Sequence, residues 1–341
     1  MRAAVVTGPG KLEVQTLPEP KPSGYQALCK ILFGSVCSGT DRHLIAGHPP
    51  FCHWVQTPFI LGHESIGEVM ETGAKVRHLS PGDLLTRVGA PAIGGCTPGW
   101  GGFAEFGIAT DWLAMKEDGV EGWESHTTQQ VLPPGFAPDA STMFITWRET
   151  LSYIRRLGAG PGKSILILGS GGVGLAFAAH AANLGLDDRV LVGSIARADH
   201  AGKIDVTGFY DYKQPDLPGL LAHDRLDHFD IVIDSVGTRS NFQLGLESLK
   251  PGGTLAIYGM DEAIPAPLQE QAVANGIQFH QGGYDEAEAH NEVVAMVRAG
   301  KLDARIWLDL NNHYPLEAIG EAVASIKGLG RIKPLVRIDN R

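Results

Sequence analysis

Residues 164–174 read SILILGSGGVG, and this stretch decides the fold of the chain around it. The apolar run at 165–168 is typical of a buried parallel strand. It leads directly into a Gly-x-Gly-x-x-Gly turn, and the alanine-rich stretch 175–184 that follows predicts a helix. Strand, glycine turn and helix in this order form the context that a dinucleotide-binding fingerprint requires.

Each glycine of the turn has a separate physical task. We expect Gly169 to allow a tight turn, Gly171 to let a pyrophosphate approach the backbone, and Gly174 to let the helix lie close to its strand. The N–H groups at the helix start, from Gly172 and Val173 onward, would hold the phosphate charge together with the helix dipole. The alternative is a glycine-rich turn without a ligand, which the flanking strand and helix disfavour. The turn therefore predicts a nucleotide site.

The composition is that of a globular protein with a large core. A length of 341 residues favours two domains, and 43% hydrophobic with 19% charged residues are ordinary proportions. The formal net charge of −10 disfavours a nucleic-acid partner, which needs a basic face. No apolar span of roughly 18 residues and no signal-like segment is found, so we expect no membrane partner. Too few cysteines are present for a disulfide scaffold, and a reducing cytoplasm fits them best: Cys29, Cys37, Cys52 and Cys96.

The pattern of elements changes along the chain. Residues 1–140 are rich in short β-like runs and turns, which predict an all-β, barrel-like lobe, and these runs lie at 3–7, 12–16, 25–34, 60–73 and 83–88. Residues 141–285 alternate strands with helices and predict a doubly wound parallel sheet, with strands at 165–168, 190–192, 209–211, 231–234, 254–257 and 278–282. The tail predicts a helix at 291–299 and a last strand at 335–338. A helix at 238–249 should be stopped by the Pro-Gly-Gly that begins at Pro251.

Several stretches of the chain carry a family resemblance. They are CSGTDRH at 37–43, PFILGHESIG at 58–67, PGD at 81–83, GGFAEF at 101–106, the glycine turn, and KPGGTL at 250–255. On these motifs the chain resembles the medium-chain dehydrogenase/reductase superfamily, the zinc-type alcohol and polyol dehydrogenases. The resemblance implies a GroES-like β-barrel catalytic domain made of 1–140 and 286–341, with a Rossmann nucleotide domain at 141–285. It also implies hydride transfer between an alcohol carbon and a nicotinamide, in a homodimer or homotetramer.

The end of the second predicted nucleotide-domain strand indicates which nicotinamide cofactor is bound. A site selective for NAD places an acid there to bind the ribose 2′-OH, but residues 193–197 read GSIAR. Ser194 and Arg197 can instead bind a 2′-phosphate through charge-assisted hydrogen bonds. By resemblance, Tyr212 would lie beside that phosphate. The alternative is that Arg197 is only solvated and Tyr212 packs on a sheet edge. The sequence favours NADP(H) over NAD(H).

The resemblance further implies one catalytic zinc with three protein ligands and an open position. His63 and Glu64 match the family's Gly-His-Glu motif. Cys37 stands one residue away from the usual cysteine position because Ser38 is interposed, and serine is a poor zinc ligand. The candidate ligands are therefore Cys37, His63 and Glu64, and a site without zinc remains open.

The third ligand position of the family does not carry a donor in this sequence. It falls on Ile145, and Glu149 lies one helical turn further on, so Glu149 could reach inward only if the helix were shifted. A second, structural zinc is not expected, because the segment 89–102 offers Cys96 alone and one thiolate cannot close a tetrahedral site.

Thr40 and His43 stand three residues apart, and by resemblance they relay the alcohol proton to solvent. Hydride leaves an alcohol carbon only as its O–H loses a proton, so a polarising group and a proton relay are both needed. Together with His63 and Glu64 they are the predicted catalytic residues. The alternatives are that His43 is a surface histidine and that Thr40 only caps the following turn.

Three functions remain open at this stage. The first is an NADP(H)-dependent dehydrogenase of a secondary alcohol, polyol or sugar, assisted by zinc. The second is a zinc-free NADPH-dependent reductase of a carbonyl or activated alkene, and the third is a nucleotide-binding sensor without turnover. The sequence does not indicate the substrate. Four tryptophans could line a pocket, although scattered aromatic residues more often belong to the core: Trp54, Trp100, Trp112 and Trp147.

Overall fold

The computed structural model describes residues 1–224, 229–326 and 330–339, and they form two compact units. The first unit contains Met1–Ile145, Glu286–Ala295 and Asp303–Arg341, and the second contains Thr146–Asp285 and Met296–Leu302. The division thus falls after Ile145 rather than at residue 140. In addition, Met296–Leu302 belongs to the second unit, whereas the sequence interpretation gave all of 286–341 to the first.

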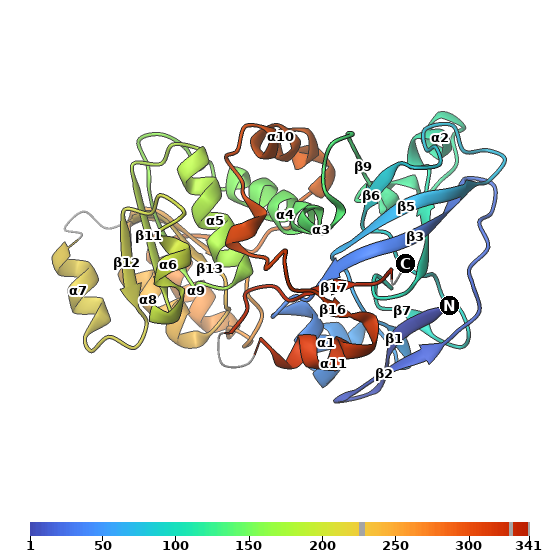
Figure 1. The fold of residues 1–341 in the computed structure, drawn as a ribbon. Helices are drawn as coiled ribbons and strands as arrows, with labels where there is room; N and C mark the ends of the chain where they lie inside the picture. Colours follow the sequence, from blue (N-terminus) through green and yellow to red (C-terminus); the bar gives the residue numbers. More distant parts are fainter. Residues whose placement is uncertain (225–228, 327–329, 340–341) are drawn as a thin grey trace. The chain divides into compact units, whose positions relative to one another are not determined.

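Two sheets form the first unit (Figure 1). The smaller sheet has the strand order β2-β1-β4-β7, and the larger has the order β16-β17-β3-β5-β6-β9, with β8 paired to β3. The strands are β1 (Arg2–Gly8), β2 (Lys11–Thr16), β3 (Gln26–Ser35), β4 (Phe59–Ile60), β5 (Ser65–Thr72), β6 (Leu84–Thr86), β7 (Thr97–Pro98), β8 (Phe106–Thr110), β9 (Val131–Leu132), β16 (Tyr314–Pro315) and β17 (Leu335–Arg337). Its helices are α1 (Thr40–Ala46), α2 (Trp112–Glu117), α3 (Pro138–Ser141), α10 (Glu286–Arg298), which continues into the second unit, and α11 (Ile319–Ala324).

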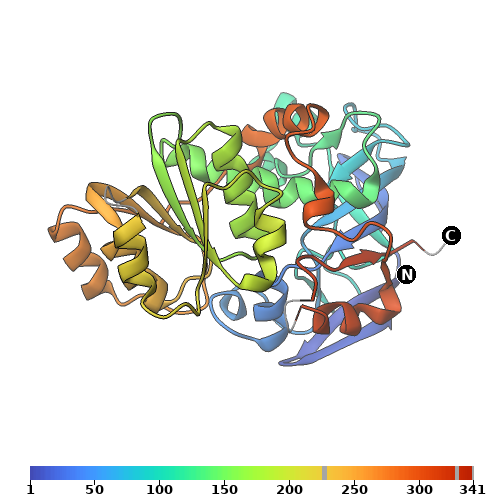
Figure 2. The same cartoon turned by 60° about the vertical axis from the view of Figure 1, so that its left-hand side comes forward.

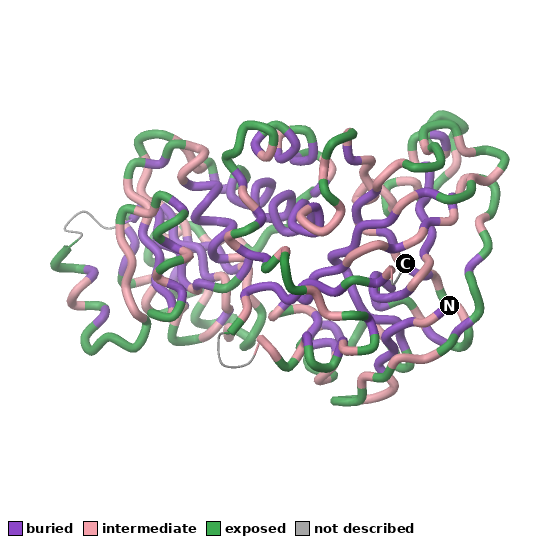
Figure 3. The backbone as a smooth tube through the Cα atoms, in the orientation of Figure 1, coloured by how far each residue is buried: buried purple, intermediate pink, exposed green. Residues whose placement is uncertain are grey.

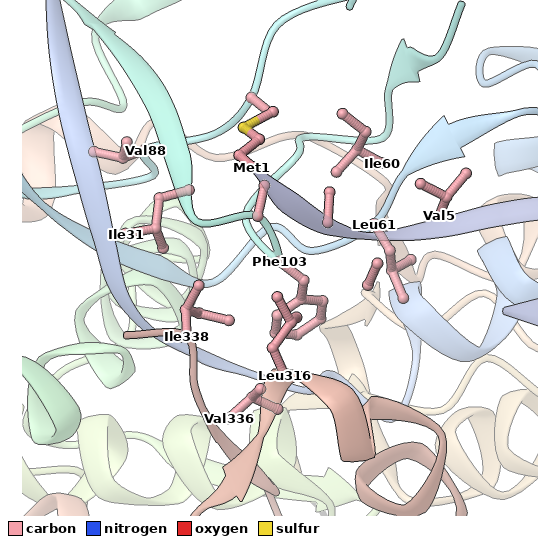
Figure 4. Packing of buried hydrophobic residues seen from close by; sticks show 14 of the residues in the cluster. Met1, Val5, Ile31, Ile60, Leu61, Val88, Phe103, Leu316, Val336 and Ile338 are labelled. Atoms are coloured by element: carbon pink, nitrogen blue, oxygen red, sulfur yellow. The ribbon is translucent and has the colours of Figure 1, made fainter. Parts of the chain in front are cut away.

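Residues from both ends of the chain share the core of the first unit (Figure 4). Met1 and Val5 of the N-terminal segment belong to the same buried cluster as Leu316, Val336 and Ile338 of the tail. Because apolar burial is the dominant favourable term in folding, the tail contributes directly to the stability of a unit that begins at the other end of the chain.

The run expected at 60–73 as one strand is two strands in different sheets. β4 (Phe59–Ile60) pairs with β1, whereas β5 (Ser65–Thr72) pairs with β3. Gly62 lies between them with a φ of +104°, and a Cβ there would lie 2.6 Å from the backbone nitrogen of Phe103. Only glycine can adopt this conformation in so close a contact. The chain therefore changes sheets at the glycine of the Gly-His-Glu motif.

The second unit contains the predicted doubly wound parallel sheet, with strand order β12-β11-β10-β13-β14-β15. Helices lie on both sides of it (Figure 2), and its central strands are buried (Figure 3). The strands are β10 (Ser164–Leu168), β11 (Asp188–Gly193), β12 (Gly208–Asp211), β13 (Phe229–Asp234), β14 (Leu249–Ile257) and β15 (Gln278–His280). The helices are α4 (Met143–Arg156), which starts in the first unit, α5 (Gly172–Asn183), α6 (Ala198–Ala201), α7 (Leu217–Asp224), α8 (Arg239–Glu247) and α9 (Ala266–Ala274).

The Pro-Gly-Gly at 251–253 does not stop a helix, and the prediction that it would was wrong. Helix α8 already ends at its C-cap, Ser248, and β14 begins at Leu249. The three residues form an irregularity inside β14, where the pairing with β13 shifts register between Phe229 and Ile231. A bulge of this kind accommodates residues that interrupt a regular ladder, as proline does.

Among the described residues, none of the helices combines the length and apolar character that a membrane span requires.

Candidate active site

The glycine turn joins β10 to α5 at the switch point of the sheet, where the strand order reverses between β10 and β13. Gly169 has a φ of +110°, and a Cβ on Gly174 would lie 1.8 Å from the carbonyl oxygen of Gly169. Neither position can hold a side chain. Gly171 is the N-cap of α5, and Val173 and Gly174 present their backbone N–H groups in its first turn. This is the positive end of the helix dipole, where an anion is stabilised.

The ends of β11 and β12 lie next to this turn. The backbone N–H of Ser194 donates to Ser170 Oγ (3.0 Å), and a Cβ on Gly193 would lie 2.2 Å from Ser170 Cβ. The N–H of Tyr212 donates to the carbonyl of Gly193 (2.9 Å). The structure therefore brings two of the predicted cofactor residues, Ser194 and Tyr212, to neighbouring strand ends.

The alternatives stated from the sequence were that Arg197 is only solvated and that Tyr212 packs on a sheet edge, and the structure shows neither. Arg197 is only 5% exposed and is not a solvated surface side chain; its burial lowers the pKa of the guanidinium. Tyr212 is 54% exposed, and Lys213 Nζ lies 5.6 Å from its ring centre, so this tyrosine is open to solvent rather than packed on the edge of the sheet.

In the first unit, the candidate metal ligands come together. The ligand atoms of Cys37, His63 and Glu64 all lie within 4.8 Å of one another, and all three residues are buried. Cys37 follows β3, and His63 and Glu64 follow the sheet change at Gly62. The extra residue Ser38 lies in a turn with Gly39 before α1, so it does not remove the Cys37 sulfur from the group. We refer to these three residues as the donor cluster.

Asp41 is fully buried and organises one side of the donor cluster. It accepts the backbone N–H of Cys37 (2.8 Å) and the Nδ1–H of His63 (3.0 Å). A carboxylate can only accept, so Nδ1 of His63 carries a proton, and Nε2 is the atom that can bind a metal once it has given up its own proton. Burial alone would lower the pKa of His63, but the charge and hydrogen bond of Asp41 raise it well above its usual value.

Lys333 holds the other side of the donor cluster. Its Nζ contacts both carboxylate oxygens of Glu64 at 2.5 Å, and Ser35 Oγ donates to the same carboxylate (2.6 Å). Both charged side chains are 2% exposed. Burial would raise the pKa of Glu64, but the charge of Lys333, followed by that of His63, lowers it to about 2. Glu64 is therefore ionised at neutral pH.

Arg87 fixes the backbone of the cluster. It is a non-glycine residue with a φ of +60°, and its guanidinium donates to the carbonyl of His63 (2.9 Å). Its other nitrogens pair with Glu286, the first residue of α10, at 2.6 and 3.0 Å. Both side chains of this ion pair are almost completely buried.

Two further positions were named from the sequence, and each is described within its own unit. Ile145 is completely buried and carries no donor atom. Glu149, in the second unit, accepts hydrogen bonds from the hydroxyls of Tyr258 (3.1 Å) and Tyr284 (2.9 Å), which belong to the same unit.

The predicted relay residues lie on α1. Thr40 is its first residue, but the N-cap is Gly39 and no side chain makes a cap hydrogen bond, so the capping role offered as an alternative for Thr40 is not observed at this described helix. His43 is 7% exposed, unlike a surface histidine, and its Nδ1–H donates to the carbonyl of Pro49 (3.2 Å).

Sequence reasoning missed three residues of this site. Asp41 was inside a quoted motif, but its role depends on reaching His63 in space. Arg87 and Lys333 had no local signal, since Lys333 meets Glu64 across 269 residues of sequence. A buried carboxylate is rarely found without a cationic partner, so a search for the partner of each expected buried carboxylate could have suggested these two residues.

Comparisons with known proteins agree with this architecture. The protein-family model described as "Alcohol dehydrogenase GroES-like domain" matches residues 23–118, and the family model described as "Zinc-binding dehydrogenase" matches residues 172–282. The chain is 30% identical to a glucose 1-dehydrogenase of Thermoproteus tenax over 76% of each chain. It is 23% identical to a sorbitol dehydrogenase of Bacillus subtilis over 95% of this chain and 92% of that one.

The fold is also shared with a solved structure. The alcohol dehydrogenase TADH from Thermus sp. ATN1 superposes with a TM-score of 0.82 at 21% identity, covering 99% of this chain and 100% of the other. The two units therefore correspond to a GroES-like domain and a Rossmann domain. The chain belongs to the medium-chain dehydrogenase/reductase superfamily and is an alcohol-dehydrogenase-like oxidoreductase.

Proposed function

We propose that this protein is an NADP(H)-dependent dehydrogenase that interconverts an alcohol and its carbonyl compound with the help of one catalytic zinc. The observation that carries the proposal is the donor cluster, in which three buried donors converge in the unit that also presents Thr40 and His43 on α1. The names of the matched relatives, which act on glucose and sorbitol, support the same class of reaction.

The chemistry of the donor cluster suits zinc. Thiolate, imidazole and carboxylate are ligands of catalytic zinc sites, which keep a fourth position open for substrate. Asp41 directs Nε2 of His63 to the metal by holding Nδ1–H. A carboxylate offers about four lone-pair positions, so Glu64 can serve both Lys333 and a metal. When bound, the ion would act as a Lewis acid on the substrate oxygen.

The chain's own residues would manage the proton. When bound, the oxidised nicotinamide would supply the hydride acceptor: in the oxidation direction the C–H bond of the carbinol carbon would break, and its hydrogen would leave with the electron pair. The O–H proton leaves, so the products are the carbonyl compound, the reduced nicotinamide and a proton. The hydroxyl of Thr40 would accept a hydrogen bond from the alcohol and donate onward, and His43 would release the proton outward, since imidazole is a common general acid and base in enzymes.

NADP(H) is the proposed cofactor. Ser194 and Tyr212 meet at the strand ends where the adenosine ribose of a Rossmann site lies, and Arg197 is the nearby cation in a segment that contains no acid, 193–197. A buried arginine is well placed to strengthen a charge-assisted bond to a phosphate, because the interaction is less screened than in water.

A second candidate is a zinc-free NADPH-dependent reductase of a carbonyl or activated alkene. The observation that favours it is the ion pair of Glu64 with Lys333, which satisfies the carboxylate without any metal. Thr40 and His43 would then donate the proton that accompanies the hydride. A panel of alcohols and ketones, followed by the absorbance of NADPH, tests both candidates. Turnover of neither class with NADPH or NADH would contradict the proposed function.

The relay gives a specific kinetic prediction. Thr40→Val keeps the shape of the side chain but removes its hydroxyl, so kcat should fall by at least about 100-fold while NADPH affinity stays unchanged. His43→Ala should lower kcat by a smaller factor. Small buffer molecules should partly restore the activity of this variant, because solvent can replace an outer relay group. Wild-type turnover in the Thr40→Val enzyme would remove Thr40 from the mechanism.

We also propose a homodimer or homotetramer in a reducing cytoplasm. This rests on the resemblance to the family and on the free thiols of the four cysteines. Light scattering that gives the mass of a single chain, 36.4 kDa, would contradict the oligomer.

A further inference from the structure

The aromatic side chains beside the candidate active site indicate the class of substrate. We infer that the substrate carries an aromatic or similarly bulky apolar group next to its reacting carbon, rather than the row of hydroxyls of a polyol or sugar. The inference rests on the proposed function and specifies its substrate. It is carried by Phe51, Trp54 and Trp100, which we refer to as the aromatic cluster.

The aromatic cluster connects the two candidate catalytic histidines. The Phe51 ring lies edge-on to Trp54 (5.5 Å between ring centres) and to Trp100 (6.2 Å). Trp100 in turn lies 5.7 Å from the ring of His63, and Phe51 lies 6.4 Å from the ring of His43. A ligand whose oxygen reaches His63 and whose proton is passed toward His43 would therefore have these rings as its neighbours.

The exposure of the cluster distinguishes it from core aromatic residues. Phe51 is 5% exposed and anchors the group, whereas Trp100 and Trp54 remain 41% and 65% exposed. Trp147, by contrast, is 1% exposed and belongs to the core. Large apolar side chains left open beside polar catalytic groups are typical of a ligand-binding surface.

The backbone fixes the direction of Trp100. It is a non-glycine residue with a φ of +66°, a conformation that bulky residues rarely adopt. The N–H groups of Gly99 and Gly101 both donate to the carbonyl of Ile60 (2.9 and 3.2 Å), and the carbonyl of Gly101 accepts the N–H of Ala90 (3.0 Å). A conformation of this kind persists only where the surroundings impose it, and such positions concentrate at ligand sites.

The chemistry of these rings discriminates between substrate classes. Each hydroxyl of a polyol loses its water on binding and needs a new hydrogen-bond partner, which an aromatic face does not supply. A phenyl group can instead make edge-to-face contacts with Trp100 and Phe51 while burying apolar area. A sugar ring can also stack on tryptophan, so glucose is included in the test.

The test compares kcat/KM with NADP⁺ for 1-phenylethanol, 2-propanol, sorbitol and glucose. We expect 1-phenylethanol to exceed the other three by at least about tenfold. Trp100→Ala should lower the ratio of 1-phenylethanol to 2-propanol by about tenfold, and Trp100→Phe should keep most of it. The matched control is Trp123→Ala, which removes a tryptophan of the same unit that stacks on Trp112 (6.1 Å between centres) and should leave the ratio unchanged.

A binding measurement separates this inference from the proposed function. Acetophenone cannot be reduced by NADP⁺, so calorimetry can measure its affinity for the enzyme–NADP⁺ complex. We expect Trp100→Ala to weaken that affinity about tenfold. Preference for sorbitol or glucose, or equal acetophenone binding by both enzymes, would overturn the inference and leave the proposed function intact. Binding that depends on Trp100, without turnover of any alcohol, would support the inference and overturn the proposed function.

Discussion

The glycine turn of the second unit and the donor cluster of the first are built in opposite ways. The turn is a contiguous stretch, and its geometry is set by backbone conformation, as the φ of +110° at Gly169 shows. The donor cluster is assembled from Cys37, His63 and Glu64, and its carboxylate is paired with Lys333 at a sequence separation of 269 residues. The glycine turn depends on the absence of side chains, whereas the donor cluster depends on buried charges from distant parts of the sequence that pair in the folded chain.

This difference determines how much stability a mutation in each region should cost. Removing one member of a buried ion pair leaves an uncompensated charge, which costs far more than the pair itself contributes. Adding a methyl group to a tight turn causes local overpacking, which is a smaller and more local penalty. Stability measurements on variants of the two regions therefore test the contrast directly.

The largest effect is expected for Lys333→Met. It leaves Glu64 buried and unpaired at 2% exposure, so in metal-free protein the free energy of unfolding should fall by about 3–5 kcal/mol. Urea denaturation in the presence of a chelator measures this change. The double variant Glu64→Gln/Lys333→Met should recover much of the loss. A loss below about 1 kcal/mol for Lys333→Met alone would show that the pair is not buried as described.

Arg197→Ala should have an intermediate effect, seen in cofactor affinity rather than in folding. The loss of a charge-assisted hydrogen bond should weaken the binding of NADPH by about 1.5–3 kcal/mol and leave the binding of NADH nearly unchanged. Fluorescence titration with both cofactors measures the difference. Equal weakening of NADPH and NADH would show that Arg197 does not contact the 2′-phosphate and acts only through packing.

The smallest effect is expected at the strand end beside the glycine turn. Gly193→Ala places a Cβ 2.2 Å from Ser170, and this overpacking should cost about 1–3 kcal/mol of stability and weaken cofactor binding. Gly160→Ala is the matched control, since a Cβ there would meet no atom within 4 Å. If the two variants melt at the same temperature, the close approach at Gly193 is not part of the folded structure.

The sequence predicted the parts of the molecule that depend on neighbouring residues. The strand, turn and helix around Gly169 follow from hydrophobic period and glycine spacing, and both agree with β10 and α5. The sheet change at Gly62 was not predicted, because the sequence does not distinguish a glycine with a positive φ from a glycine in a continuous strand. The Pro-Gly-Gly after Lys250 was misassigned because a β-bulge and a helix stop use the same residue types.

The candidate site was predictable only in part, for the same reason. His63 and Glu64 lie in a local motif, whereas the partners that fix their charge states come from distant segments. Asp41 orients His63, Lys333 neutralises Glu64, and Arg87 holds the backbone carbonyl of His63. No periodicity or spacing encodes such contacts, and the contact between Lys333 and Glu64 exists only after both chain ends have packed into one core.

The central claim is that the donor cluster holds a catalytic zinc, and the metal content of the purified protein tests it most directly. Elemental analysis should find about one zinc per chain in the wild-type protein, and Cys37→Ala and His63→Ala should each lose it because a catalytic site has only three protein ligands. Cys96→Ala is the control, since this thiol lies outside the donor cluster, and it should retain the metal. A wild-type protein that reduces carbonyl compounds with NADPH while containing no zinc would contradict the claim.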